Sequence, residues 1–209
     1  MMQFNITDDV RPWLIVQRGG EAQFAHDQKR WQHEFETTLG QTLMNMQPYF
    51  PTKCDNYLDL GSGLGAIDML IRNHYDGKAV ATLIDGNDKN ASVPKKEQGT
   101  YSNRAAALAF WRANGFRAPH YLTPDEARKR VNELPIFDLV ISVGSWCFHY
   151  APGVFLDLVK QTTKPGSVII TDVRTRQTAW ANVLAKEFKL IAEIPVPLAK
   201  YHKAVYHVT

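Results

Sequence analysis

Three glycines at alternate positions, Gly61, Gly63 and Gly65, follow an apolar segment and precede a helical one. A strand, a glycine turn and a helix in this order form a nucleotide-type binding loop, because glycine lets main-chain N–H groups approach a ligand closely. Gly61, Gly63 and Ala66 also fit the dinucleotide pattern G-x-G-x-x-G/A. Asp59 lies two residues before the first glycine, where its carboxylate would repel a pyrophosphate and suit an ammonium or a sulfonium. The alternative is a capping or solvated carboxylate beside a structural turn.

A second acidic residue, Asp85, follows the next apolar run, residues 79–84. Its separation from Gly61 is close to that of the acid that binds ribose hydroxyls in nucleotide-binding folds. Asp85 and Gly86 also form an Asp-Gly pair, which is a turn signal. We favour ribose binding, with Gly86 and Asn87 beside the same ligand.

Composition limits the class of protein. A chain of 209 residues fits one domain with a proper core. No apolar run approaches the roughly 20 residues that span a bilayer, and the N-terminus lacks the features of a signal peptide. Cys54 and Cys147 are far apart, which favours a reducing cytoplasm over a disulfide framework or a zinc site. The net charge of +3 comes from small basic groups, so a solvated surface is favoured over nucleic-acid binding. No cluster of histidine and acidic residues has metal-site spacing. We expect a cytoplasmic protein with no metal and no membrane partner.

The order of apolar and polar segments predicts an α/β chain. Residues 1–25 read as an irregular arm, and apolar residues at helical spacing predict a helix over 26–46 that Pro48 and Pro51 end. Strands are predicted over 56–60, 79–84, 118–122, 137–143, 167–171, 190–196 and 204–208, and further helices after the glycines, over 101–114, from Thr123, over 152–164 and over 178–188. Only about eight residues separate the last two strands, too few for a parallel crossover, so these strands should pair antiparallel.

Residues 59–65 read Asp-Leu-Gly-Ser-Gly-Leu-Gly, and this Asp-x-Gly-x-Gly-x-Gly motif resembles the first motif of class I S-adenosylmethionine (SAM)-dependent methyltransferases. A mainly parallel sheet with one antiparallel strand at its C-terminal end is also the arrangement of that family, whereas an NAD-binding domain normally stays parallel. The resemblance runs from about residue 55 to the C-terminus. It implies a Rossmann-like three-layer α/β sandwich with a seven-stranded sheet over 51–209. Residues 1–50 would form an arm and a helix in the acceptor or lid region.

This resemblance also implies an enzyme, one that transfers a methyl group from SAM and leaves S-adenosylhomocysteine. The cofactor-binding residues that we predict are Asp59, Gly61, Ser62, Gly63, Gly65, Asp85, Gly86, Asn87 and Ser142.

Residues 142–150, Ser-Val-Gly-Ser-Trp-Cys-Phe-His-Tyr, should face the transferred methyl group. They lack the Asn/Asp-Pro-Pro-Tyr/Phe of nucleic-acid amino-methyltransferases, and Cys147 lacks the preceding proline of cytosine-C5 enzymes, so Cys147 is predicted to be a packed thiol. The run is similar to a segment of sugar O-methyltransferases. His149 is the best-placed general base for a hydroxyl acceptor, and its alternative is a structural histidine.

We therefore predict methyl transfer to a small molecule or sugar, at a hydroxyl. Three alternatives stay open: methylation of nucleic acid or protein, a non-catalytic SAM-binding module, and an NAD-dependent oxidoreductase.

Overall fold

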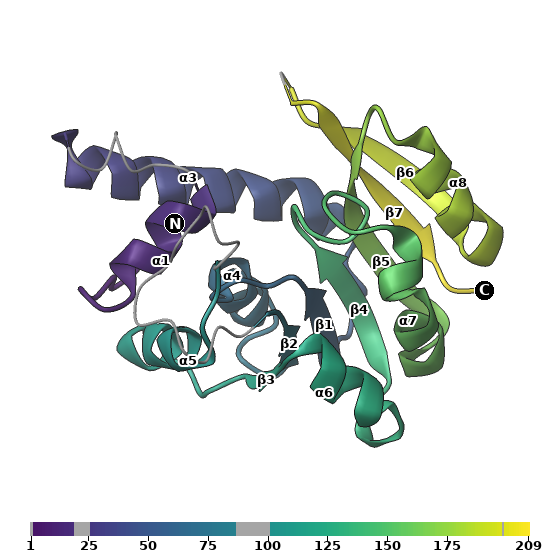
Figure 1. Ribbon diagram of the computed structural model, residues 1–209, viewed down its shortest axis with the longest axis horizontal. Coiled ribbons are helices and arrows are strands. Elements are labelled where there is room, and N and C mark those ends of the chain that lie inside the picture. Colours follow the sequence, from purple (N-terminus) through teal and green to yellow (C-terminus); the bar gives the residue numbers. More distant parts are fainter. Residues whose placement is uncertain (1, 19–25, 87–100, 198) are drawn as a thin grey trace.

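The computed structural model describes residues 2–18, 26–86, 101–197 and 199–209, and it has a central sheet with helices on both faces (Figure 1). The strands are β1 (Asn56–Leu60), β2 (Val80–Ile84), β3 (His120–Leu122), β4 (Phe137–Ser142), β5 (Thr163–Arg174), β6 (Lys189–Pro195) and β7 (Tyr201–His207). They form one seven-stranded sheet in the order β3-β2-β1-β4-β5-β7-β6. β7 pairs antiparallel with β5 and with β6, while every other neighbouring pair is parallel. The predicted sheet, with one antiparallel strand at its C-terminal end, is confirmed.

Helices cover the sheet in two layers. The α-helices are α1 (Arg11–Arg18), α3 (Gln28–Met46), α4 (Ala66–His74), α5 (Arg104–Ala113), α6 (Pro124–Lys129), α7 (Leu156–Thr162) and α8 (Thr178–Glu187), with 3-10 turns η1 (Gln47–Tyr49), η3 (Val131–Glu133) and η4 (Pro152–Val154). One apolar cluster joins α1, α3, α4 and α5 to one face of the sheet, and a second joins α6, α7 and α8 to the other face. The predicted three-layer sandwich is confirmed.

Side chains of β1 alternate between these two clusters, as the period of a strand requires. Tyr57 packs on the α4 face, whereas Leu58 and Leu60 pack on the opposite face. Asp59 is two residues from Tyr57, so its carboxylate also points to the α4 face. The strand therefore directs this carboxylate into the interior and not into solvent.

The N-terminal segment differs from its prediction as an irregular arm, because Arg11–Arg18 forms α1. Its apolar residues Val10, Trp13 and Leu14 are all buried in the cluster that contains α3, α4 and α5. Phe4 belongs to the same cluster, with its ring centroid 5.5 Å from that of Phe110. Burial of one apolar side fixes this helix, although it is shorter than an isolated helix needs to be.

Strand β5 is longer than predicted. The expected helix over 152–164 stops at Thr162, and β5 begins at Thr163, so Pro165 and Gly166 lie within the strand and not in a turn before it. The register between β4 and β5 shifts at this point, and Gly166 has a φ of 91°. An irregular pairing therefore accommodates the two residues. At its other end β5 continues to Arg174, beyond the predicted end at residue 171.

No helix of the described ranges is both long and apolar enough to cross a membrane.

Candidate functional site

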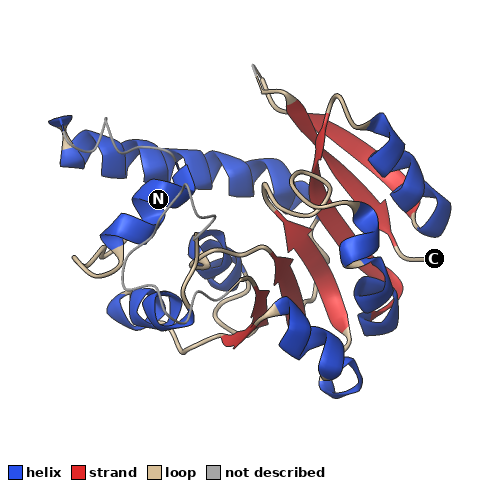
Figure 2. Ribbon diagram, in the orientation of Figure 1, coloured by secondary structure: helices blue, strands red, loops and turns tan. Residues whose placement is uncertain are grey.

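A cavity of about 690 Å³ lies at the carboxyl ends of β1, β2, β4 and β5. This is the edge at which open α/β sheets bind ligands, and the volume is typical of small-molecule sites. The loops that follow the strands are drawn in tan in Figure 2. Side chains of α1 and α3 complete the wall, among them Leu14, Gln17 and Phe35.

The glycine loop after β1 approaches its neighbours too closely for a side chain. Gly61 has a φ of 80°, and a Cβ there would lie 1.9 Å from Oγ of Ser145 in the loop after β4. Gly63 has a φ of 59°, and its Cβ would lie 2.7 Å from Oε1 of Gln17. Gly61 therefore needs glycine for two reasons, the left-handed backbone and the close contact, whereas Gly63 needs it for its left-handed backbone, because the end of the Gln17 side chain can shift. Both residues line the cavity.

Gly65 has a different surrounding. It precedes α4 with a φ of 74°, and a Cβ there would lie 2.6 Å from Nε1 of Trp111 and 2.7 Å from Cδ1 of Leu83. It is not among the residues that line the cavity. The third glycine of the motif thus serves the packing of the loop on α5 and β2.

Asp59 lines the cavity from beneath the loop and is 1 % exposed. Its Oδ1 is buried and has no hydrogen-bond partner in the described part of the chain. Burial raises the pKa of Asp59 well above its usual range, and the charge of the neighbouring Asp68 raises it further. Asp68, on the first turn of α4, is itself fully buried, and burial raises its pKa to about 7. Two neighbouring carboxyl groups that are both buried do not ionise together, so near neutral pH they hold one proton between them.

Asp85 ends β2 and faces the same cavity. Its Oδ2 accepts a hydrogen bond from the main-chain N–H of Gly63, and its Oδ1 accepts one of 2.8 Å from Oγ of Ser102. The carboxylate thus joins the glycine loop to the segment that leads into α5.

The remaining predicted cofactor residues lie in different surroundings. Ser62 lines the cavity, and its hydroxyl is buried with no partner among the described residues. Ser142 instead joins two chain segments, donating to the carbonyl of Leu60 at 2.6 Å and accepting from the N–H of Trp146 at 2.8 Å. The carbonyl oxygen of Gly86 accepts a hydrogen bond from the Tyr121 hydroxyl at 3.2 Å, and Asn87 lies outside the described residues. Neither Ser142 nor Gly86 lines the cavity.

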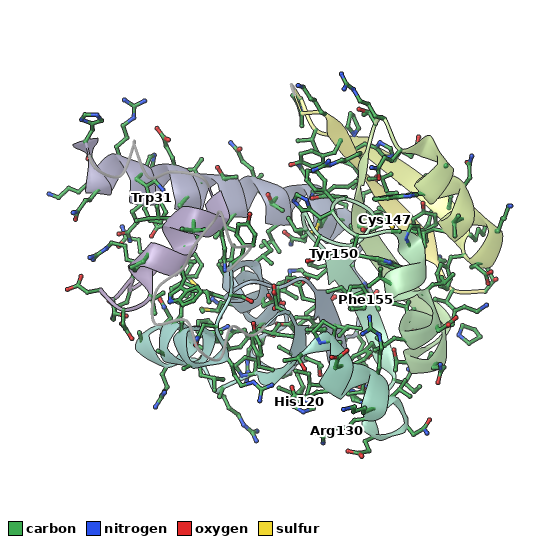
Figure 3. The ribbon with its side chains drawn as sticks, in the orientation of Figure 1. Trp31, His120, Arg130, Cys147, Tyr150 and Phe155 are labelled. Atoms are coloured by element: carbon green, nitrogen blue, oxygen red, sulfur yellow. The ribbon has the colours of Figure 1, made fainter. Side chains whose placement is uncertain are left out.

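The loop after β4 forms the outer part of the site, and Figure 3 labels Cys147 and Tyr150 in it. Cys147 is fully buried with a φ of 62°, and burial raises the pKa of its thiol to about 12. A thiol with such a pKa is not a nucleophile near neutral pH, which agrees with the prediction of a packed thiol. Phe148, His149 and Tyr150 line the cavity, and Tyr150 is 54 % exposed.

His149 lies at the exposed mouth of the cavity, with its Nδ1 3.4 Å from Nη2 of Arg174. Partial desolvation by its neighbours lowers the pKa of His149, and the charge of Arg174 lowers it further. Because a guanidinium only donates, Nδ1 must accept, and the proton of the neutral imidazole then lies on Nε2. The histidine is therefore neutral near pH 7, with its basic nitrogen directed at Arg174.

Asp172 of β5 is a site residue that sequence reasoning missed. It lines the cavity and bonds to Nζ of Lys203 on β7 at 2.6 Å. Its other oxygen accepts from the N–H of Gly144 at 2.9 Å. Both side chains of the ion pair are almost fully buried. No sequence signal paired them, because the contact depends on the antiparallel register that places residue 172 opposite residue 203.

A metal site has no support in the described ranges, where no three His, Cys, Asp or Glu side chains lie together as ligands.

The sequence matches no protein-family model and no curated protein. Solved structures match in fold. Ribosomal protein L11 methylase from Lactobacillus delbrueckii subsp. bulgaricus has a TM-score of 0.57 and 14 % identity, over 83 % of this chain and 78 % of that one. MtNAS in complex with MTA and tNA has a TM-score of 0.61 and 11 % identity, over 96 % of this chain and 71 % of that one. Fibrillarin, in its complex with Nop5p, has a TM-score of 0.54 and 11 % identity, over 74 % of this chain and 73 % of that one.

The chain has the fold of the class I methyltransferases. The three similar proteins differ in what their names say they bind or modify, so the shared fold does not specify an acceptor.

Proposed function

We propose that the protein is a SAM-dependent methyltransferase that acts on a small molecule or sugar, at a hydroxyl group. The observation that carries this proposal is the buried Asp59 carboxyl beneath the glycine loop, with an oxygen that has no partner among the described residues. A buried polar atom without a partner is costly in a folded protein unless a ligand satisfies it.

The charges around the cavity favour a cationic cofactor over a dinucleotide. Asp59 and Asp85 both face the space around the glycine loop. A pyrophosphate placed there would be repelled by the Asp85 carboxylate and by the one negative charge that Asp59 and Asp68 keep between them, whereas an ammonium would be attracted to both. The same geometry supports Asp85 as the partner of the ribose hydroxyls, because its carboxylate lies at the end of β2, beside the loop.

Bound SAM supplies an electrophilic methyl group on a sulfonium. In our proposal Asp59, Ser62 and the N–H groups of the glycine loop hold the charged end of this cofactor, and Asp85 holds its ribose. Phe148 and Tyr150 cover the reacting end and exclude water, and Leu14 and Gln17 of α1 close the opposite wall. In the same proposal, α1 and α3 cover the site, which is the acceptor or lid role that we propose for residues 1–50.

His149 is the proposed general base, with its proton acceptor at Nδ1. Its lowered pKa keeps the imidazole neutral near pH 7, as a base requires. Nδ1 must first leave its contact with Arg174. The role therefore depends on what Arg174 binds when an acceptor is present.

A second candidate reaction is transfer of the aminocarboxypropyl chain of SAM, the larger group on the same sulfonium, in place of the methyl group. The match to MtNAS covers 96 % of this chain, so it must include more than half of α3, from which Phe35 lines the cavity. The name of that complex includes MTA, and methylthioadenosine is what remains of SAM after its aminocarboxypropyl chain has been transferred. Methyl transfer would leave S-adenosylhomocysteine instead, so the product that accumulates separates the two reactions.

One experiment tests these proposals together. The full chain is incubated with methyl-labelled SAM and, separately, with the low-molecular-weight, RNA and protein fractions of a cell extract. Label in the low-molecular-weight fraction, with formation of S-adenosylhomocysteine, is the expected result. Label in RNA or protein would overturn the acceptor class, and methylthioadenosine would favour the second candidate. SAM that binds but is never consumed would indicate a non-catalytic module.

A further inference from the structure

Arg174 ends β5 beside the mouth of the cavity, where aromatic side chains hold its guanidinium. The guanidinium carbon lies 4.4 Å from the centroid of the Phe148 ring, a cation–π contact. Phe148 in turn packs edge-on against the rings of His149 and Tyr201, with centroids 4.8 Å and 5.4 Å away. These contacts orient the guanidinium without neutralising it.

No carboxylate of the described residues forms an ion pair with Arg174, whose contacts are those with Phe148 and His149. Asp172 precedes it by two residues on β5, but its carboxylate bonds to Lys203 and to the N–H of Gly144. In this buried ion pair the charges of Asp172 and Lys203 compensate each other. Arg174 therefore contributes a net positive charge at this end of the site.

The two ends of the site thus carry opposite charge. Asp59 and Asp85 lie around the glycine loop, where the proposed cofactor is cationic. Arg174 and His149 lie at the other end, where the acceptor would enter. A guanidinium presents paired N–H donors that match the oxygens of a carboxylate or a phosphate, and its aromatic support reduces the entropy lost on binding.

We infer that Arg174 binds an anionic group of the methyl acceptor, a carboxylate or a phosphate. That the anionic group belongs to a methyl acceptor rests on the proposed function, whereas the anion site itself does not. It also explains how His149 becomes a base. An anion that takes the N–H donors of Arg174 competes with Nδ1 of His149 for them, and its binding frees that nitrogen to accept a proton.

Binding of small probes tests the anion site without any turnover. The full chain, with S-adenosylhomocysteine added, is titrated with benzoate, phenyl phosphate and the neutral benzamide, and binding is followed by NMR. We expect at least one of the two anions to bind about tenfold or more tightly than benzamide, the range for hydrogen bonds to a charged group. Arg174→Gln should lose this preference. Arg176→Gln removes an exposed arginine two residues further on and should retain it. Equal binding of anions and benzamide, or an unchanged preference in Arg174→Gln, would overturn the inference.

The charge of the reaction product gives a second readout. The labelled product of the extract experiment is passed over an anion-exchange resin near neutral pH. Retention supports the inference, and a labelled product in the flow-through contradicts it. If no fraction accepts label, the proposed function fails, and the probe titration still decides whether Arg174 is an anion site.

Discussion

Replacing Asp68 by asparagine should make the free protein less sensitive to alkaline pH. Asp68 is fully buried on the first turn of α4, beside the buried carboxyl group of Asp59. Burial raises its pKa from an ordinary value of 3.8 to about 7. The folded state then holds a proton that the unfolded chain has lost, so the free energy of unfolding falls as pH rises from about 4 to 7.

The size of the effect follows from the shift in pKa. A shift of about three pH units, at about 1.4 kcal/mol per unit, corresponds to a loss on the order of 4 kcal/mol between pH 4 and pH 8. The amide of an asparagine cannot titrate, and the substitution also removes the like charge that raises the pKa of Asp59. The Asp68→Asn variant should therefore lose about 4 kcal/mol less than the wild type over this range.

Urea unfolding at about pH 4.5 and at about pH 8 measures the effect. The difference between the two pH values is compared, so any constant cost of the buried amide cancels. Asp76→Asn, at an exposed carboxylate after the same helix, is the matched control and should behave as the wild type. If Asp68→Asn and the wild type lose the same stability between the two pH values, the carboxyl pair does not share a proton, and the reasoning about Asp59 fails with it.

Three further substitutions test the site. Asp85→Ala should weaken SAM binding by about 1.5–3 kcal/mol in calorimetry, because hydrogen bonds to a charged group are lost; unchanged affinity in a folded variant would remove Asp85 from the site. Gly63→Val should abolish SAM binding, because the backbone is left-handed there and the new side chain displaces Gln17 from the cavity wall; titration that matches the wild type would mean that the loop does not contact the cofactor. His149→Ala should reduce turnover by roughly 10²–10⁴-fold with little change in SAM affinity, and the acidic limb of the pH–rate profile should disappear. Near-normal turnover would exclude His149 as the base and leave alignment of the acceptor with the methyl group as the source of catalysis. A variant that does not fold would favour a structural role for His149.

Much of the fold could be predicted because its signals are local. The apolar runs predict β1 with its observed bounds. Thr123 is the predicted N-cap of α6, and its hydroxyl and Glu126 form a capping box there. The short link between β6 and β7 was enough to predict their antiparallel pairing, since a parallel crossover needs more residues. The glycine spacing likewise located the loop that lines the cavity.

The rest depends on contacts between distant segments. Nothing near Asp68 in the sequence shows that strand alternation brings Asp59 to the same face, nor does the sequence around Gly63 show that Gln17 lies against it. Ser142 is among the predicted cofactor-binding residues, and in the structure its hydroxyl bonds to the carbonyl of Leu60 across the sheet. A sequence pattern locates the polar residues at strand ends, but it does not show whether each side chain bonds to a ligand or to the protein backbone.

Calorimetric titration of the full chain with SAM, and in parallel with NAD, tests the central claim most directly. We predict that SAM binds at one site per chain, that Asp59→Asn weakens this binding, and that NAD produces no saturable heat. Saturable binding of NAD with none of SAM would contradict the assignment of a cationic cofactor to the buried carboxyl beneath the glycine loop.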